Sequence, residues 1–210
     1  MMGLRGYGRM VVGLLALWLG LITAPVRAAE PVLLVFGDSL SAGYGIAAQA
    51  AWPRLLDQTL KQQGKPYRVV NASVSGETTA GGRTRFPAAL KQHKPTIVVI
   101  ELGANDGLRG LPVKTARANL AAMIEAAQRS GAKVHLVGMQ MPPNYGPDYT
   151  AEFAAAYADL ARRYRTGFTP FLLAPVIARP DLFQNDRLHP TAEAQPLLAR
   201  MLARDLAPLL

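Results

Sequence analysis

The sequence predicts an α/β fold, in which a parallel sheet of about five strands is covered by helices on both faces. Short apolar runs alternate along the chain with longer segments whose apolar residues recur at helical spacing. This alternation is typical of βαβ units. Small and polar residues directly follow the first three apolar runs, and the carboxyl ends of strands are where open α/β sheets bind their ligands.

Five segments are predicted as strands. The first, 32–36, is an unbroken apolar run that stops at a Gly-Asp-Ser turn, which is the pattern of a strand buried on both faces. The others are 67–71, 96–101, 133–138 and 168–172. The segment 96–101 is the most β-branched of them, which favours a strand.

Five further segments are predicted as helices. Pro53 lies early in the first of them and Gly64 just past its end, as is typical of helix starts and stops. The predicted helices are about 50–63, a stretch through Phe86, Ala89 and Leu90, about 112–130, about 149–164, and a last helix carrying Leu197, Leu198, Met201, Leu202 and Leu206. We expect Thr191 to cap this last helix.

Length and composition narrow the function classes. The chain has 210 residues, of which half are hydrophobic, and no cysteine. It is therefore one globular domain without a thiol nucleophile, a thiolate metal site or a disulfide. Its formal net charge is +9, but no basic run carries the stacking aromatics of a nucleic-acid site. We therefore interpret the charge as a solvated basic surface and expect no nucleic-acid partner.

Residues 1–28 are predicted to be a cleaved signal peptide. Arg5 and Arg9 form a positive start, an uncharged apolar run follows over 10–23, and Val26-Arg27-Ala28 matches a small-x-small cleavage site. The run is shorter than the ~20 residues that span a bilayer. We therefore expect a mature chain of residues 29–210, periplasmic or secreted, without stable membrane anchoring.

Few residues of the chain are candidates for a serine nucleophile, its base and the acid that orients the base. Ser39 follows the first strand, and His189 has an acid, Asp186, three residues before it. A local turn lets the Asp186 carboxylate accept from one ring nitrogen of His189 while the other faces outward, the relation that a serine nucleophile needs. Each motif alone is also compatible with an ordinary structural turn.

Two further groups follow the next two strands. Gly76 offers a bare backbone N–H and Asn105 offers a side-chain amide, and such donors stabilise a tetrahedral oxyanion. Because the carboxyl ends of parallel strands share one edge, these groups are able to meet Ser39.

The blocks that contain these residues occur in the order found in the SGNH, or GDSL, hydrolase superfamily, which the chain resembles. They are Gly37-Asp38-Ser39-Leu40, Gly76, Gly103-Ala104-Asn105-Asp106 and Asp186-Arg187-Leu188-His189-Pro190. Segments 50–53, 70–76, 101–110, 143–146 and 194–196 are similar to those of the bacterial periplasmic multifunctional acyl-CoA thioesterases, lysophospholipases and arylesterases. The resemblance covers essentially all of residues 29–210.

The resemblance implies a three-layer, flavodoxin-like α/β/α fold. It implies that Ser39 is the nucleophile, His189 the general base and Asp186 its orienter, with an oxyanion hole formed by the Ser39 N–H, Gly76 and Asn105. The implied activity is hydrolysis of carboxylic esters and thioesters, including acyl-CoA thioesters, aryl esters and lysophospholipids, through an acyl-enzyme on Ser39. We expect no cofactor and no metal site, an acyl ester or thioester as the partner, and a monomer.

Apolar residues in the predicted loops are candidates for an acyl groove, although ordinary core packing explains each of them equally well. The candidates are Leu40, Leu108, Leu111, Met139, Met141 and Tyr145. We expect the segment 107–112, which has glycines at both 107 and 110, to close over an acyl chain through its leucines.

Two alternative functions remain open on the sequence. A carbohydrate O-acetylesterase uses the same constellation of residues. A non-catalytic flavodoxin-like binding module, with the 37–45 loop cradling a phosphate, is compatible with the fold but leaves Asn105, Asp186 and His189 without a role.

Overall fold

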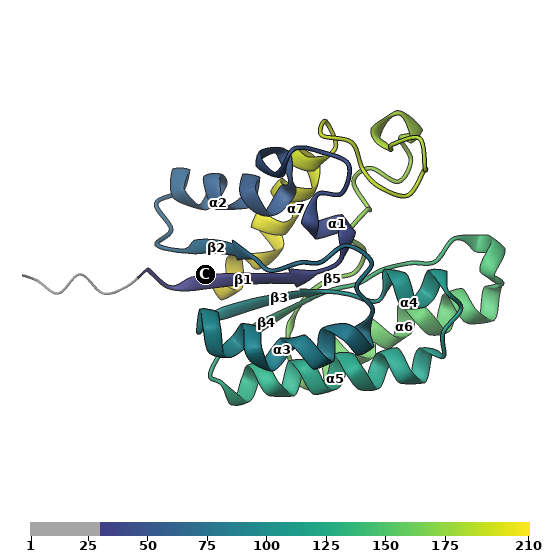
Figure 1. The fold of residues 1–210 in the computed structure, drawn as a ribbon, viewed down its shortest axis with the longest axis horizontal. Helices are drawn as coiled ribbons and strands as arrows, with labels where there is room; N and C mark the ends of the chain where they lie inside the picture. Colours follow the sequence, from purple (N-terminus) through teal and green to yellow (C-terminus); the bar gives the residue numbers. More distant parts are fainter. Residues whose placement is uncertain (1–29) are drawn as a thin grey trace, which may run out of the picture.

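A five-stranded parallel sheet forms the centre of the protein in the computed structural model, which describes residues 30–210 (Figure 1). The strands are β1 (Val32–Gly37), β2 (Arg68–Asn71), β3 (Ile97–Glu101), β4 (Lys133–Val137) and β5 (Gly167–Thr169). Their order is β2-β1-β3-β4-β5, and every neighbouring pair is parallel. This is the flavodoxin-like strand order, and the predicted fold class is confirmed. The predicted signal peptide, 1–28, lies outside the described residues.

Helices cover both faces of the sheet. On one face lie α2 (Trp52–Gln62) and α7 (Gln195–Leu206), and on the other lie α3 (Thr79–His93), α5 (Val113–Arg129) and α6 (Pro147–Tyr164) (Figure 1). Two short helices, α1 (Ser39–Ala42) and α4 (Ala104–Leu108), directly follow β1 and β3. Short 3₁₀ turns occupy Ala48–Ala50, Pro143–Tyr145, Pro180–Leu182 and Ala207–Leu209. No helix within 30–210 is long and apolar enough to span a bilayer.

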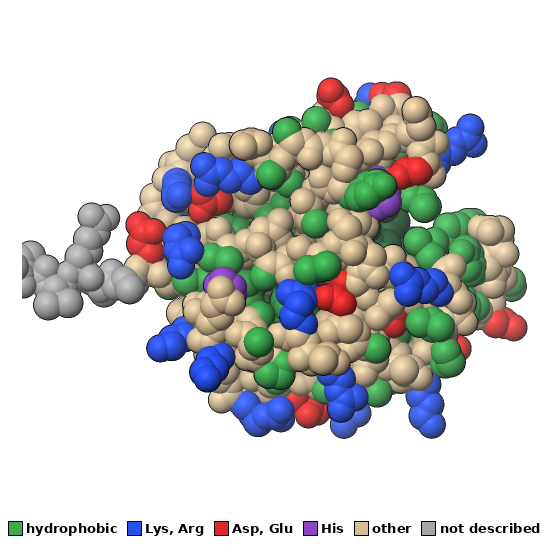
Figure 2. Space-filling model, in the orientation of Figure 1, with side chains coloured by type: hydrophobic (Ala, Val, Ile, Leu, Met, Phe, Trp, Pro, Cys, Tyr) green, Lys and Arg blue, Asp and Glu red, His purple; other side chains and the backbone are tan. Residues whose placement is uncertain are grey.

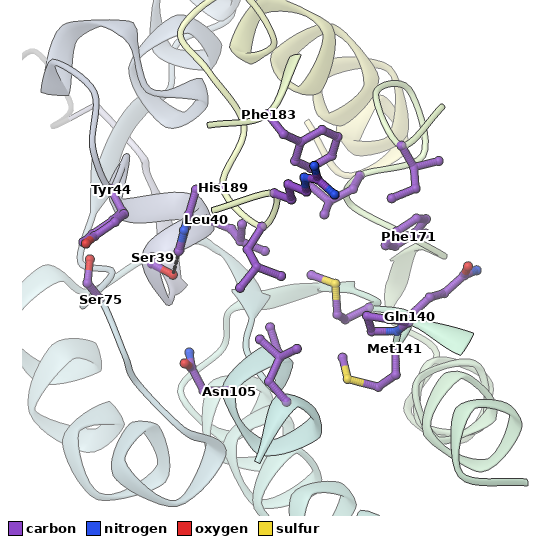
Figure 3. Close-up of a pocket in the computed structure, with 18 of the residues that line it drawn as sticks. Ser39, Leu40, Tyr44, Ser75, Asn105, Gln140, Met141, Phe171, Phe183 and His189 are labelled. Atoms are coloured by element: carbon purple, nitrogen blue, oxygen red, sulfur yellow. Dashed lines mark hydrogen bonds between the residues drawn. The ribbon is translucent and has the colours of Figure 1, made fainter. Parts of the chain in front are cut away.

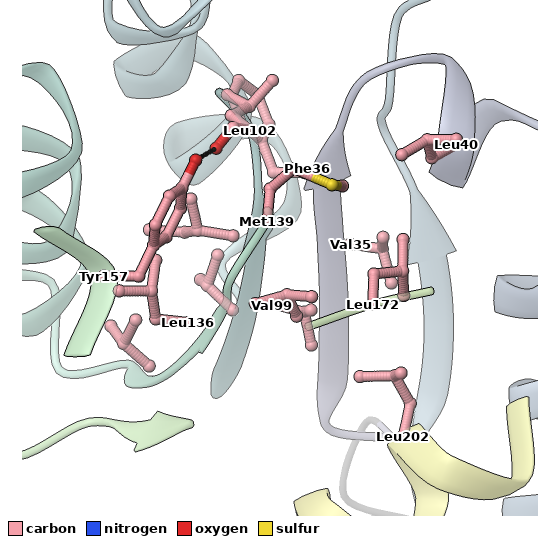
Figure 4. Close-up of a cluster of buried hydrophobic side chains, with 14 of the residues drawn as sticks. Val35, Phe36, Leu40, Val99, Leu102, Leu136, Met139, Tyr157, Leu172 and Leu202 are labelled. Atoms are coloured by element: carbon pink, nitrogen blue, oxygen red, sulfur yellow. Dashed lines mark hydrogen bonds between the residues drawn. The ribbon is translucent and has the colours of Figure 1, made fainter. Parts of the chain in front are cut away.

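The central strands are buried on both faces, as their unbroken apolar runs predict. Every residue of β1 and of β3 is buried. Figure 4 shows side chains from these strands, including Val35 and Val99, packed with residues such as Leu136 and Leu202. The hydroxyl of Tyr157 on α6 donates to the carbonyl of Leu102 at 2.9 Å, which ties the loop after β3 to the helix layer.

The strand order has a functional consequence at the carboxyl edge of the sheet. From β1 the chain first forms β2 on one side and then crosses to form β3 on the other. The strands β1 and β3 therefore flank the topological switch point, where open α/β sheets leave a crevice for ligands. Ser39 follows β1 and Asn105 follows β3.

The structure corrects two predicted boundaries by two residues or more, and it corrects one predicted cap. The last strand ends at Thr169 instead of residue 172, since Pro170 has no N–H to donate to a sheet. The helix α6 begins at Pro147, two residues earlier than predicted, because proline is favoured in a first helical turn. Thr191 does not cap α7, which begins at Gln195 with no side-chain cap. The Gln195 side chain instead accepts from the Trp52 N–H at 3.0 Å.

Candidate active site

Ser39 is the first residue of the short helix α1, directly beyond the end of β1. Asp38 caps this helix, because its carboxylate accepts from the Leu40 N–H at 3.0 Å. Gly43, with φ at 78°, ends the helix after one turn, in the left-handed conformation that glycine adopts most easily. The apolar strand and the two caps together hold the Ser39 hydroxyl at the switch point.

His189 lies 150 residues after Ser39 in the sequence, and its ring connects Ser39 with Asp186. Its Nε2 lies 2.8 Å from the Ser39 Oγ, and its Nδ1 lies 2.6 Å from the Asp186 Oδ2 (Figure 3). The other carboxylate oxygen of Asp186 accepts from the backbone N–H groups of Leu188 and His189 at 2.9 and 3.0 Å. The carboxylate therefore fixes both the histidine ring and the turn that carries it.

Electrostatics keep Asp186 ionised. Partial desolvation raises the pKa of this carboxyl, but the two backbone N–H groups and the His189 ring outweigh it and lower the pKa to about 2. An ionised acceptor at Nδ1 requires a proton on that nitrogen, which leaves Nε2 free to accept a proton from Ser39.

Tyr44 also contacts His189, which the sequence alone did not indicate. The ring centroids lie 4.6 Å apart at an angle of 41°, and the side chain of Gln184 donates to the Tyr44 carbonyl at 2.8 Å. The tyrosine is more than half exposed and lies beside Ser39 and Ser75 at the cavity mouth (Figure 3).

The predicted oxyanion donors Gly76 and Asn105 lie in the same cavity as Ser39. Gly76 has φ at 79°, and no atom lies within 4 Å of the position that a Cβ would take there. The amide of Asn105 donates to the Glu77 carbonyl at 3.0 Å and to Asp38 at 3.3 Å. These contacts hold the amide between the loop before α3 and the Asp38 side chain beside Ser39.

Asp106 joins the two loops that supply these donors. Its carboxylate accepts from the N–H of Thr79 at 2.8 Å and from the hydroxyl of Thr79 at 2.6 Å. This buried pair links the start of α3 to α4. No helix was predicted at the Gly-Ala-Asn-Asp segment, but α4 begins at Ala104, after Gly103 with φ at 121°.

A cavity of about 580 Å³ opens beside Ser39 and His189, and most of its wall is apolar. Figure 2 shows a hollow on this face, lined by hydrophobic side chains and bordered by a histidine. The apolar lining residues are Leu40, Leu108, Met139, Met141, Pro142, Pro143, Phe171, Leu173, Ile177, Phe183 and Leu188. A cavity of this size and lining accommodates an aliphatic or aromatic acyl group.

Four of the six predicted groove residues line this cavity, namely Leu40, Leu108, Met139 and Met141. Tyr145 does not line the cavity. Its hydroxyl donates to the Leu108 carbonyl at 2.8 Å and so contacts the end of α4. Leu111 is also absent from the lining and is 39% exposed. Sequence reasoning missed four lining residues between β5 and α7, namely Phe171, Leu173, Ile177 and Phe183. The only sequence signal for them was a concentration of apolar side chains in an irregular segment.

Two other polar groups lie outside the cavity. His135 on β4 is buried, contacts Thr169 Oγ1 at 2.8 Å, and its pKa is lowered to about 4 by burial. Ser41 is also buried, and its hydroxyl donates to the Glu101 carboxyl at 2.6 Å. Neither residue lines the cavity.

The sequence of residues 35–196 matches the model of the GDSL-like lipase/acylhydrolase family. The chain belongs to this family. It is an ester hydrolase of the GDSL, or SGNH, type, as the sequence resemblance predicted.

Three relatives match along nearly all of their length. The chain is 46% identical to esterase TesA of Pseudomonas aeruginosa over 91% of this chain and 96% of the relative. It is 43% identical to an arylesterase of Vibrio mimicus, over 93% and 98%. It is 42% identical to thioesterase 1/protease 1/lysophospholipase L1 of Escherichia coli K12, over 92% and 91%. A crystal structure of TesA superposes with a TM-score of 0.83 at 47% identity, covering 85% of this chain and 99% of that one.

Proposed function

We propose that this family member cleaves carboxylic esters and thioesters through an acyl-enzyme on Ser39, with His189 as general base and Asp186 as the residue that orients it. The observation that supports these roles is the continuous chain of contacts from Ser39 Oγ through both ring nitrogens of His189 to Asp186. It lies at the wall of a largely apolar cavity that Gly76 and Asn105 also line.

The mechanism follows from this geometry. The Ser39 Oγ attacks the carbonyl carbon while His189 Nε2 takes the hydroxyl proton. The N–H groups of Ser39 and Gly76 and the amide of Asn105 stabilise the oxyanion of the tetrahedral intermediate. His189 then gives its proton to the leaving oxygen or sulfur, and water, deprotonated by the same histidine, hydrolyses the acyl-enzyme.

We propose aryl esters, acyl-CoA thioesters and lysophospholipids as the substrate classes. The names of the relatives include arylesterase, thioesterase and lysophospholipase, and the apolar cavity of about 580 Å³ suits an acyl chain. An acetyl group fills only a small part of such a cavity. Hydrolysis of acetylated sugars without activity on longer acyl chains would instead favour a carbohydrate O-acetylesterase.

We also propose that residues 1–28 direct export and are removed, so that residues 29–210 act as a periplasmic or secreted monomer without a stable membrane anchor. The positive start, the short apolar run and the small-x-small site support this proposal. The mass of the protein recovered from a periplasmic extract tests it, because cleavage leaves a chain that begins at Ala29. Sedimentation of the mature protein tests the monomer.

Steady-state kinetics on an aryl ester test the catalytic roles. Ser39→Ala and His189→Ala are each expected to lower kcat by at least about 10³-fold, and the double variant to be little worse than either, because members of a triad act as one unit. Ser130→Ala is the matched control, since this serine ends α5 away from the cavity. Losses that add in the double variant would contradict a shared step.

A further inference from the structure

Arg187 is exceptional among the residues that line the cavity. In the part of the chain that the structure describes, it is the one lysine, arginine, aspartate or glutamate in the lining. It is exposed, lies two positions before His189, and lines a pocket whose wall is mostly apolar. Among residues 30–210 it takes part in no salt bridge.

The backbone of Arg187 is also unusual. Its φ is 58°, and among the described residues only Lys94 and Arg165 share a positive φ without being glycine. Those two residues end α3 and α6 in the left-handed conformation, which is a common way to end a helix. Arg187 ends no helix.

The turn between Asp186 and His189 imposes this conformation, because Asp186 accepts from the N–H groups of the two residues that follow Arg187. Glycine adopts a positive φ at lower cost. An arginine at this position therefore supplies a cation at the cost of backbone strain. Strained backbone conformations are often found at ligand-binding sites.

The proton transfer from His189 determines which part of a substrate lies near the Arg187 side chain. The proton that His189 carries goes to the leaving atom, so the leaving group lies on the His189 side of the scissile bond. The acyl chain takes the apolar wall formed by residues such as Met141 and Phe171. Arg187, on the same turn as His189, is then close to the leaving group.

We propose that Arg187 is a specificity-determining residue that binds a phosphate on the leaving group of the substrate. Its planar guanidinium donates two parallel hydrogen bonds to phosphate oxygens. Two of the proposed substrate classes share this chemistry, because lysophospholipids and acyl-CoA both carry phosphate beyond the scissile bond. The inference rests on the proposed function and adds that phosphate-bearing leaving groups are preferred to neutral ones.

The test compares substrate pairs that carry the same acyl chain, kept below the concentration at which they form micelles. One pair is a lysophosphatidic acid and the corresponding monoacylglycerol, and the other is an acyl-CoA and the acyl-N-acetylcysteamine thioester. Arg187→Gln is expected to lower kcat/KM about fivefold to tenfold on the phosphate-bearing member and to leave the neutral member unchanged. Arg187→Lys, which keeps the charge without the planar fork, is expected to lose less.

Arg165→Gln is the matched control, since it removes the same charge from another left-handed arginine that does not line the cavity. For each pair, we compare the ratio of kcat/KM on the phosphate-bearing substrate to kcat/KM on the neutral one. Arg165→Gln is expected to leave both ratios unchanged. A fall confined to one pair supports the inference and identifies whether lipid or CoA phosphate is the source. Added salt is expected to reduce the phosphate preference of the wild type but not that of Arg187→Gln.

Two results would overturn the inference. Equal ratios in wild type and Arg187→Gln would show that the cation does not contact phosphate. An equal loss on charged and neutral substrates would show that Arg187 serves only the turn. In either case, hydrolysis of the neutral esters by the wild type would leave the proposed function intact, whereas its absence would count against the proposed function itself.

Discussion

Asp186 acts on His189 through two separate sets of hydrogen bonds, one to the ring and one to the backbone. Asp186→Asn preserves an oxygen for the backbone N–H groups but offers Nδ1 an amide, which stabilises the wrong tautomer of the ring. We expect kcat on an aryl ester to fall by about 10³–10⁴-fold with little change in KM. Asp181→Asn, which loses an exposed ion pair to Arg179 outside the cavity, is the control. Wild-type turnover in Asp186→Asn would mean that another group orients His189.

Two buried acids, Asp38 and Glu101, lie close to the Ser39 turn. They are expected to make the stability of the fold depend on pH. Burial, and then the neighbouring Asp38, raise the pKa of Glu101. Burial likewise raises the pKa of Asp38 to about 6. The folded protein therefore retains protons that the unfolded chain releases above about pH 4. The free energy of unfolding is expected to fall as pH rises through about 4 to 6 and somewhat beyond.

Glu101→Gln tests this assignment, because glutamine has the shape of the protonated acid but does not titrate. Denaturant unfolding at about pH 5 and pH 8 is expected to show a smaller loss of stability in the variant than in the wild type. The glutamine is still able to accept the hydrogen bond from Ser41, so the variant is expected to fold. An identical loss in both proteins would place the titration elsewhere.

At the scale of elements, we expect an acyl-chain preference to depend on α4. Leu108 lines the cavity, and the Tyr145 hydroxyl holds its carbonyl, while Tyr149 donates to the Leu111 carbonyl at 2.9 Å. The two leucines thus lie on one anchored segment, but only Leu108 contacts the cavity space.

Leu108→Ala is expected to lower kcat/KM on long-chain esters by up to about tenfold to a hundredfold and to spare acetyl esters, because burial of one leucine is worth roughly 1.5–3 kcal/mol. Leu111→Ala is the control and is expected to change kcat/KM on neither the long-chain esters nor the acetyl esters. An acyl-length series beside thermal unfolding of each variant checks the result. A uniform loss at all lengths with a lowered Tm would mean that Leu108 supports the core and not the acyl chain.

Local patterns were sufficient for most elements and insufficient for a few. The strands β1 and β3 were predicted because their apolar runs are unbroken and end at small polar residues. The short helix α4 was not, because five residues are too few to show a helical period. The lining residues Phe171 and Phe183 were missed for a different reason: they come from an irregular segment, and only its path across the sheet edge brings them beside Leu40 and Met141.

At the scale of the whole molecule, the strand order explains why distant residues meet. The sequence predicted that Ser39, Gly76 and Asn105 follow parallel strands, and hence that they share one edge. It did not determine that β1 and β3 are neighbours, which is what brings Ser39 and Asn105 to the same cavity. His189 arrives by a longer route, through the loop before α7. The Asp-x-x-His spacing signalled its contact with Asp186 but not its contact with Ser39.

The central claim is that Ser39 is the nucleophile and that His189 activates it, and covalent labelling with a fluorophosphonate tests it most directly. Mass mapping of the labelled protein is expected to find one adduct per chain, on Ser39 and not on Ser41, with labelling abolished in Ser39→Ala and slowed by orders of magnitude in His189→Ala. An adduct on another residue, or undiminished ester hydrolysis by a protein whose Ser39 is fully labelled, would contradict the account.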